Sequence, residues 1–306
     1  MSVPTFTHQP LSEILDWLRS ELGSGGEARL NVPAPDAGHA LNLYPGETGP
    51  VGIHRPYLSW QDAADLLDAQ FLTPVQAGDL VQLHFRRRQT VPRDRSSGRY
   101  AAGSEFSRID KLEDPHFLHD LSEALTRAKL QPGARVLSLG VNSGRELDLL
   151  EHVYPGHAFQ VLGLDLEPSA LEVARARHPA YEFRVQDVTR PGLNELGRPK
   201  LVRYDAVLAL SLLQSTGIVQ EDLLRTLRSD LLAPSGTLIL GFPNARYRGG
   251  ELSYGARMLN FTRPDLSLLM RDVTAARRHL QRHGFTVYVT GKYEVLVTGV
   301  RQESRS

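Results

Sequence analysis

Two glycines and two aspartates stand at positions where a chain can hold a nucleoside-containing ligand. Gly140 and Gly144 bracket a turn between a predicted buried strand and the helix after it. Glycine lets the backbone approach a ligand closely, and the helix start offers free N–H donors. Asp165 ends the next predicted strand, where a carboxylate can accept hydrogen bonds from both ribose hydroxyls. Asp187 ends a third predicted strand, where its carboxylate could accept from an adenine amino group.

Each of these features also has a purely structural explanation. Glycines are common in tight turns, and an aspartate at a strand end can cap a turn or a helix. The order of the features favours a ligand site, because each falls at the carboxyl end of a successive strand. Open α/β sheets bind their ligands at that edge. The sequence therefore predicts one binding site along this edge.

The elements that must position these residues are strands and helices in regular alternation. Apolar strands are predicted at 136–140, 160–165, 181–187, 204–210 and 236–241. Helices between them indicate a parallel sheet covered on both faces. A helix over 264–283 follows, with Thr262 and Asp265 spaced as a capping box. The stretches 285–290 and 294–299 are separated by so few residues that they must pair antiparallel.

The N-terminal part of the chain has a different pattern. Residues 11–22 carry apolar side chains at helical spacing, and Ser59 is expected to cap a helix that runs to residue 70. Residues 80–86 alternate as a strand does. We therefore expect a smaller α+β region over 1–105, with a possible role in substrate binding, and the larger α/β domain over 106–306.

Composition limits the class of protein. The 306 residues include 35 basic and 35 acidic side chains, so the chain lacks an overall charge footprint of nucleic-acid binding. No apolar run is long enough for a membrane span, and the first residues do not resemble a signal peptide. The absence of cysteine excludes disulfides and thiolate metal sites, and no other spacing of His, Asp or Glu suggests a metal. We expect a cytoplasmic protein.

Residues 135–300 resemble the class I S-adenosylmethionine (SAM)-dependent methyltransferases. The resemblance lies in the order of the glycine turn and the two aspartates, and in the closing antiparallel hairpin. It implies a Rossmann-like seven-stranded sheet with a C-terminal antiparallel hairpin. It also implies SAM as the cofactor and methyl transfer as the reaction.

The resemblance further implies which part of the cofactor each motif would meet. The turn residues that would hold the methionine part are Gly140, Val141, Asn142 and Gly144. Asp165 would bind the ribose beside Leu166, and Asp187 would read the adenine edge together with the Val188 N–H. Ser211, after the fourth strand, would lie beside the transferred methyl group.

Two positions depart from the family's usual pattern. An acid often lies two residues before the first glycine, where this chain has Ser138, and the usual middle glycine is Asn142. That acid normally helps to bind the amino group of SAM. Glu146, in the first helical turn, either takes over this role or is an acid favoured by the helix dipole. The turn also fails the G-x-G-x-x-G fingerprint, with Asn142 between its glycines and Leu147 after them, which counts against NAD.

Methyl transfer is an in-line displacement, and a protein promotes it mainly by holding nucleophile and methyl at attack distance. A general base is needed only where the acceptor must lose a proton, and no residue is assigned that role. Candidates for acceptor binding are Asn244, Arg246 and Tyr247, after the fifth strand, although structural hydrogen bonding would also explain them. His116 and Arg108, before the first strand, are further candidates.

The connection over 243–262 is long for a compact domain. Its aromatic residues, which include Tyr254 and Phe261, suggest either a lid over the acceptor or a static loop that fills the core.

Seven arginines lie between Arg86 and Arg108, in a stretch that reads as a loop. Such a loop could grip phosphates, or it could be a solvated segment of an arginine-rich protein. We expect a methyltransferase that acts on an unidentified acceptor, with a small molecule favoured over RNA and no membrane partner. The alternatives are an RNA methyltransferase that uses residues 86–108, a SAM-binding protein without catalysis, and a nicotinamide-dependent oxidoreductase.

Overall fold

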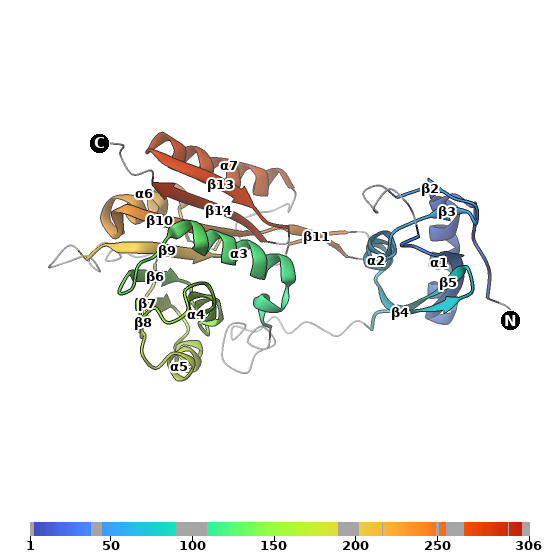
Figure 1. The fold of residues 1–306 in the computed structure, drawn as a ribbon, viewed down its shortest axis with the longest axis horizontal. Coiled ribbons are helices and arrows are strands. Elements are labelled where there is room, and N and C mark those ends of the chain that lie inside the picture. The colour runs from blue at the N-terminus through green and yellow to red at the C-terminus, as the bar shows by residue number, and fades with distance from the viewer. Residues whose placement is uncertain are drawn as a thin grey trace. The chain divides into compact units, whose positions relative to one another are not determined.

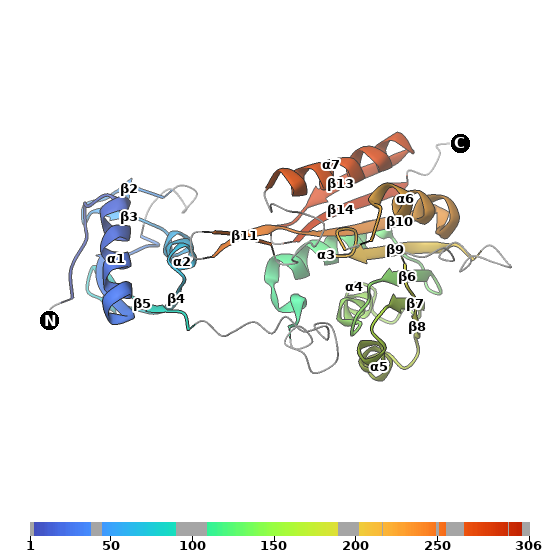
Figure 2. The same cartoon turned by 180° about the vertical axis from the view of Figure 1, so that it is seen from behind.

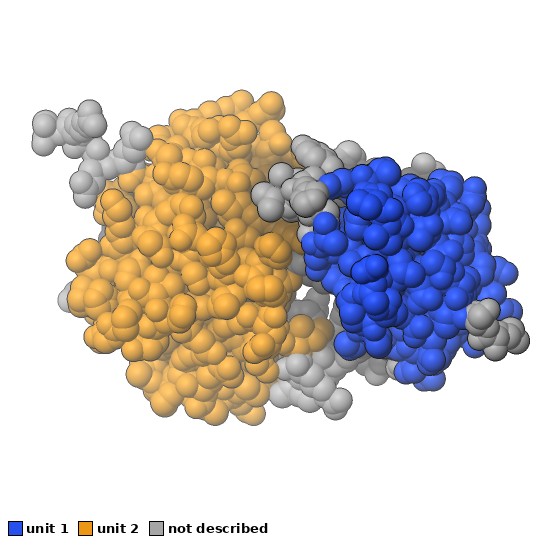
Figure 3. All heavy atoms as spheres, turned by 45° about the vertical axis from the view of Figure 1, so that its right-hand side comes forward, with its two compact units in different colours: residues 1–93, 246–253 blue, residues 94–245, 254–306 orange. Residues whose placement is uncertain are grey.

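The computed structural model describes residues 3–37, 45–89, 109–188, 202–215, 217–248, 251–254, 266–292 and 294–301. The chain divides into two compact units, one of residues 1–93 with 246–253 and the other of residues 94–245 with 254–306 (Figure 3). Each unit has a hydrophobic core of its own.

The first unit packs helices against an antiparallel sheet with the strand order β1-β5-β4. Its elements are α1 (Leu11–Gly25), β1 (Glu27–Pro33), β2 (Glu47–Thr48), β3 (Ile53–His54), α2 (Tyr57–Leu66), β4 (Ala69–Ala77) and β5 (Leu80–Arg87). Every second side chain of β5 enters the core, as the alternation predicted, so that Val81, Leu83 and Phe85 are buried. Trp60 of α2 packs edge-on against Phe85, with ring centroids 6.5 Å apart.

The second helix differs from the prediction. It begins at Tyr57 after Pro56, so Ser59 is not its cap, and it ends at Leu66 instead of reaching residue 70. Asp68 adopts a positive φ of 51°, and the chain then enters β4, which pairs with β5. The prediction was wrong because the pairing of β4 depends on a strand further along the chain, which local apolar spacing does not reveal.

The second unit is built on a seven-stranded sheet with the order β13-β14-β10-β9-β6-β7-β8 (Figure 1). Its strands are β6 (Arg135–Leu139), β7 (Gln160–Asp165), β8 (Glu182–Val185), β9 (Tyr204–Leu210), β10 (Leu232–Pro243), β13 (Phe285–Thr290) and β14 (Glu294–Arg301). The five strands from β6 to β10 run parallel, whereas β14 pairs antiparallel with both β10 and β13. The predicted parallel sheet with a closing antiparallel hairpin is confirmed.

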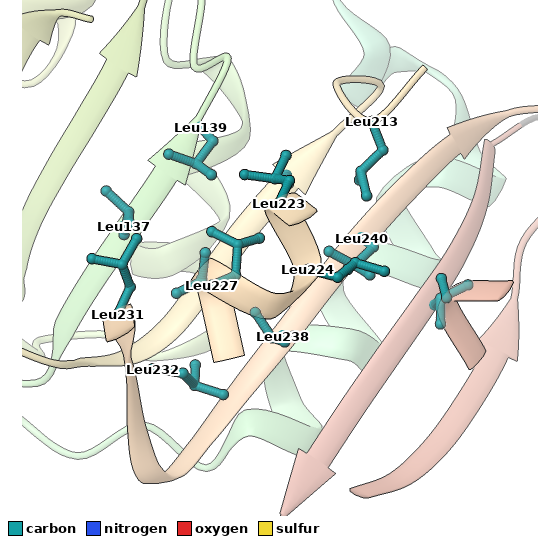
Figure 4. Packing of buried hydrophobic residues seen from close by; sticks show 14 of the residues in the cluster. Leu137, Leu139, Leu213, Leu223, Leu224, Leu227, Leu231, Leu232, Leu238 and Leu240 are labelled. Atoms are coloured by element: carbon teal, nitrogen blue, oxygen red, sulfur yellow. The ribbon is translucent and has the colours of Figure 1, made fainter. Parts of the chain in front are cut away.

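Helices cover both faces of this sheet (Figure 2). The helices on one face are α3 (Pro115–Ala128), α4 (Asp148–Val153) and α5 (Pro168–Arg177), and those on the other are α6 (Gln220–Thr226) and α7 (Leu266–Arg282). The core beneath α6 is rich in leucine (Figure 4). Leu223 and Leu227 pack there with Leu137 of β6 and Leu240 of β10, and all four side chains are buried.

The start of α3 is fixed by two aspartate caps. Asp114 accepts hydrogen bonds from the backbone N–H groups of His116 and Phe117, at 2.9 and 3.0 Å. A 3-10 turn over Lys111–Glu113 precedes the helix, and Asp110 caps it by accepting from Leu112 N at 3.0 Å. Because short polar side chains satisfy the free N–H groups of both starts, the backbone around Lys111 has a defined course.

Some further predictions are corrected by the structure, and others fall outside the described residues. The connection after β10 is not a loop throughout, because β11 (Ala245–Arg248) and β12 (Glu251–Tyr254) form a two-stranded sheet. The third parallel strand ends at Val185, two residues before Asp187. Thr262, Asp265 and Phe261 lie outside the described residues, as does most of the arginine-rich stretch, 90–108. None of the described helices combines the length and apolar character that a membrane span requires.

Candidate functional site

A cavity of about 340 Å³ lies at the carboxyl ends of β6, β7 and β9, in the range of small-ligand sites. The predicted residues on its wall are Gly140, Val141, Asn142, Asp165, Leu166, Val188 and Ser211. The strand order brings these residues together although they span some 70 positions of the sequence. Gly144 and Asp187 were predicted with them but are not among the wall residues.

The glycine turn approaches the cavity with its backbone. Gly140 has a φ of 68°, and its N–H donates to the Leu164 carbonyl of β7 at 2.8 Å. A Cβ at Gly140 would lie 3.2 Å from a methyl carbon of Leu212, so the turn is closely backed by the segment after β9. Gly144 instead lies against His178 of the α5 end, whose Nε2 is 2.9 Å from the Gly144 carbonyl oxygen. Gly144 therefore contributes to the shape of the turn on the side that faces α5, and not on the cavity wall.

Asp165 ties the turn to the end of β7. One carboxylate oxygen accepts from Asn142 N at 2.7 Å and the other from Glu167 N at 3.0 Å. A carboxylate oxygen has two lone pairs, so each can accept a further hydrogen bond from a ligand. The structural explanation of Asp165 is thus compatible with the predicted role in ligand binding.

The β7–β8 end of the cavity combines apolar and polar side chains. Leu166 is 60% exposed and stands on the wall with Val188. Gln186 is also a wall residue, which the sequence prediction missed, and its backbone N–H donates to the Asp165 carbonyl at 2.9 Å. Since β8 ends at Val185, residues 186 and 188 reach the wall and Asp187 does not. The exact end of the strand was the missing information.

Ser138 and Glu146 form a pair beneath the glycine turn. The Ser138 hydroxyl donates to the Glu146 carboxylate at 3.0 Å, and Glu146 also stands on the cavity wall. Burial raises the pKa of Glu146 to about 7, against the opposing effects of its own backbone N–H and the Ser138 hydroxyl. A carboxyl group thus lies next to Ser138, the position where the resemblance leads one to look for an acid.

A second polar cluster joins three distant segments. Lys111 Nζ donates to Ser211 Oγ at 2.7 Å and to Glu294 Oε2 at 3.0 Å, and the Ser211 hydroxyl donates to Glu294 Oε1. Glu294, at the start of β14, is only 6% exposed. Gly241 of β10 leaves room for it, because a Cβ there would lie 2.7 Å from Glu294 Oε1. Sequence reasoning found Ser211 but gave no signal for partners 100 and 83 residues away.

Asp110 and Arg145 form an ion pair on the same wall. Asp110 uses its other oxygen to cap the 3-10 turn that carries Lys111. The ion pair therefore fastens the segment before α3 to the helical turn after the glycines. Sequence reasoning did not select either residue.

Across the described part of the chain, no three His, Asp or Glu side chains are grouped so that they could hold a metal ion.

None of the predicted acceptor-binding residues is among the described residues of the cavity wall. Asn244 is not among the described wall residues, and its side-chain amide donates to the Lys292 carbonyl at 2.6 Å, which joins the end of β10 to the β13–β14 turn. Arg246 and Tyr247 belong to β11, and their side chains are outside what the structure describes. His116 is exposed in the first turn of α3, and Arg108 is not described.

The described arginines of the 86–108 stretch were predicted as a loop, but Arg86 and Arg87 belong to β5. Arg86 donates to Glu27 at 2.7 Å across the strand pair. Arg88 donates to Asp65 of α2 at 2.6 Å. Two of the three positive charges in this part of the stretch are therefore paired with acids.

A family model described as a methyltransferase domain matches residues 137–238, which run from β6 into β10. The curated protein trans-aconitate 2-methyltransferase of Methylobacterium nodulans is 39% identical over 87 residues. That match spans 28% of this chain and 32% of the relative. The chain thus corresponds to about a third of the length of this relative.

Solved methyltransferases are also similar to this chain. A TehB-like SAM-dependent methyltransferase from Corynebacterium glutamicum is 18% identical with a TM-score of 0.39, over 59% of this chain and 88% of that one. A SAM-bound amino pentose methyltransferase from Micromonospora echinaspora is 18% identical with a TM-score of 0.40, over 61% of this chain and 91% of that one.

Proposed function

We propose that this chain is a class I SAM-dependent methyltransferase and that it transfers the methyl group of SAM to a small-molecule acceptor. The observation that carries this proposal is the cavity at the carboxyl ends of β6, β7 and β9. Its wall combines the glycine turn with Asp165 and Ser211, and so has features suited to each part of the cofactor.

The chemistry of the wall fits SAM. The free lone pairs of Asp165 suit the two ribose hydroxyls, and the exposed Leu166 with Val188 offers apolar surface to the adenine ring. The carboxylate of Glu146, which accepts a hydrogen bond from Ser138, can form an ion pair with the ammonium group of the methionine part. In this proposal Glu146 takes the role of the acid that is missing at position 138.

In this proposal, the strand order indicates where the transferred methyl group lies in the site. SAM supplies an electrophilic methyl group. With adenine near β8, ribose at β7 and methionine at β6, the methyl group points toward β9, the next strand in the order. The chain acts mainly by holding the acceptor in line with that methyl group, so that little motion remains before attack. Ser211 stands at this point of the wall.

The raised pKa of Glu146 predicts a pH-dependent affinity for SAM. Only the ionised carboxyl can pair with the ammonium group, and a group of pKa about 7 gains charge as the pH rises. Between pH 6 and 7.5 its ionised fraction increases roughly eightfold, while the α-amino group of SAM stays mostly protonated. Because part of the amine deprotonates by pH 7.5, calorimetry should show SAM affinity rising about five- to sixfold.

Glu146→Gln is the matched control, because it keeps the size and the hydrogen bond to Ser138 but does not titrate. Its SAM affinity should be weaker and independent of pH over this range. An unchanged pH dependence in this variant would show that another group is responsible.

A small-molecule acceptor is favoured over RNA by the pairing of two arginines. Arg86 and Arg88 are engaged by Glu27 and Asp65, so they offer less positive charge to phosphates than the sequence suggests.

Turnover with two acceptor fractions tests the proposed function. The protein is incubated with SAM and either low-molecular-weight metabolites or total RNA, and S-adenosylhomocysteine is measured. We expect product with the metabolites. Product with RNA alone would favour the RNA methyltransferase, and SAM binding without product from either fraction would favour a non-catalytic binding protein.

A further inference from the structure

In the cluster of Lys111, Ser211 and Glu294, the positive charge is the more exposed one. The side chain of Lys111 is 40% exposed, whereas that of Glu294 is 7% exposed. Lys111 and Ser211 belong to the cavity wall, but Glu294 is not among its described residues. The ion pair therefore presents its cation to the cavity and keeps its carboxylate behind.

The cluster lies at the acceptor side of the proposed site. Ser211 follows β9, and Glu294 begins β14, beyond β10 in the strand order. The proposed adenine and ribose contacts are at β8 and β7, on the opposite side of β6. A ligand group that meets Lys111 is thus near the methyl group and far from the adenosine.

Lys111 keeps donor capacity for a ligand. An ammonium group has three N–H bonds, and the described structure uses two of them, toward Ser211 and Glu294. The Phe117 ring lies 5.7 Å from Nζ and also borders the cavity. An acceptor would therefore meet one cationic donor, one hydroxyl and a flat apolar surface.

We propose that Lys111 binds a carboxylate of the methyl acceptor, and that this carboxylate is the group methylated. The inference rests on the proposed function. One carboxylate oxygen accepts from Lys111, and the other attacks the methyl carbon. The bond from carbon to sulfur breaks with its electron pair passing to sulfur, which gives a methyl ester and a thioether. No proton moves, so no general base is required.

An amine acceptor fits the same wall poorly. A protonated amine could accept no hydrogen bond from Lys111 and would have to lose a proton before attack. A carboxylate is already ionised at neutral pH and gains a charge-assisted hydrogen bond from Lys111.

Binding to the protein saturated with S-adenosylhomocysteine tests the inference. The probes are benzoate, succinate and citrate, with benzamide and succinamide as neutral counterparts. We expect at least one carboxylate to bind by calorimetry and neither amide to do so. Lys111→Met combined with Glu294→Gln, which leaves no unpaired buried charge, should weaken carboxylate binding roughly tenfold or more. Lys111→Arg should restore it to within about threefold.

The affinity for S-adenosylhomocysteine distinguishes a failure of the inference about Lys111 from a failure of the proposed function. It should stay within about threefold of wild type in these variants, because Lys111 contacts the acceptor. A loss of more than about tenfold would assign Lys111 to the cofactor's own carboxylate and overturn the inference. Retained cofactor binding with no carboxylate bound would also overturn it, whereas no cofactor binding by the wild type would refute the proposed function itself. The methylated product should release methanol in mild alkali, and an alkali-stable methyl group would contradict an ester.

Discussion

Replacing Asp165 by alanine should weaken the affinity for SAM about 30- to 1000-fold. The carboxylate orders the turn by accepting from Asn142 N and Glu167 N, and in our proposal it also accepts both ribose hydroxyls. A hydrogen bond to a charged group contributes about 1.5–3 kcal/mol, so a net loss of about 2–4 kcal/mol is expected after water compensates in part. Titration calorimetry of the two proteins with SAM measures the difference.

Asp205→Ala provides a matched control for this variant. Asp205 also accepts a backbone hydrogen bond, from Arg135 N at 2.8 Å, but it lies at the amino end of β9, the opposite edge of the sheet. Its removal should leave SAM affinity within about threefold of wild type. If Asp165→Ala behaves in the same way, Asp165 is a turn residue only.

Replacing Gly140 by valine should weaken SAM binding roughly 5- to 150-fold. The φ of 68° disfavours a branched side chain, and the new Cβ would be 3.2 Å from Leu212. Overpacking of this kind costs about 1–3 kcal/mol of folding stability, and relief of the clash would displace the turn whose backbone lies at the cavity wall. The affinity is measured by calorimetry and the thermal stability by differential scanning calorimetry.

Gly133→Val separates backbone strain from obstruction of the cavity. Gly133 also has a positive φ, 81°, but open space surrounds the position of its missing Cβ. Both variants should lose thermal stability through the strained backbone, and Gly133→Val should keep its SAM affinity. Equal loss of affinity in the two variants would show that the cavity at Gly140 is not where SAM binds.

The sequence was sufficient to predict the sheet of the second unit because its strands are apolar and separated by helices with clear periodicity. Even α5 has the predicted bounds, Pro168–Arg177, with proline in its first turn. The predicted extent of the helix at Ser59 was wrong because β4 is defined by its pairing with β5, which is a non-local interaction. Strand-end positions were also limiting, since an end at Val185 puts Gln186 on the cavity wall in place of Asp187.

The polar partners within the site were beyond sequence reasoning. Glycine and aspartate at strand ends carry a local signal, so Gly140 and Asp165 could be selected. Lys111 and Glu294 carry none, because each depends on a side chain from a distant segment reaching the same point beside Ser211. A compensating role for Glu146 was one of two interpretations of the sequence, and its hydrogen bond with Ser138 could be found only in the folded turn.

Calorimetric titration of the wild-type protein with SAM, S-adenosylhomocysteine and NAD tests the central claim most directly. The wall of the cavity offers Glu146 to an ammonium group and Asp165 to a ribose, which SAM and its demethylated product share. We predict one-to-one binding of both, with little heat from NAD. Strong binding of NAD, with no heat from SAM or S-adenosylhomocysteine, would contradict the account.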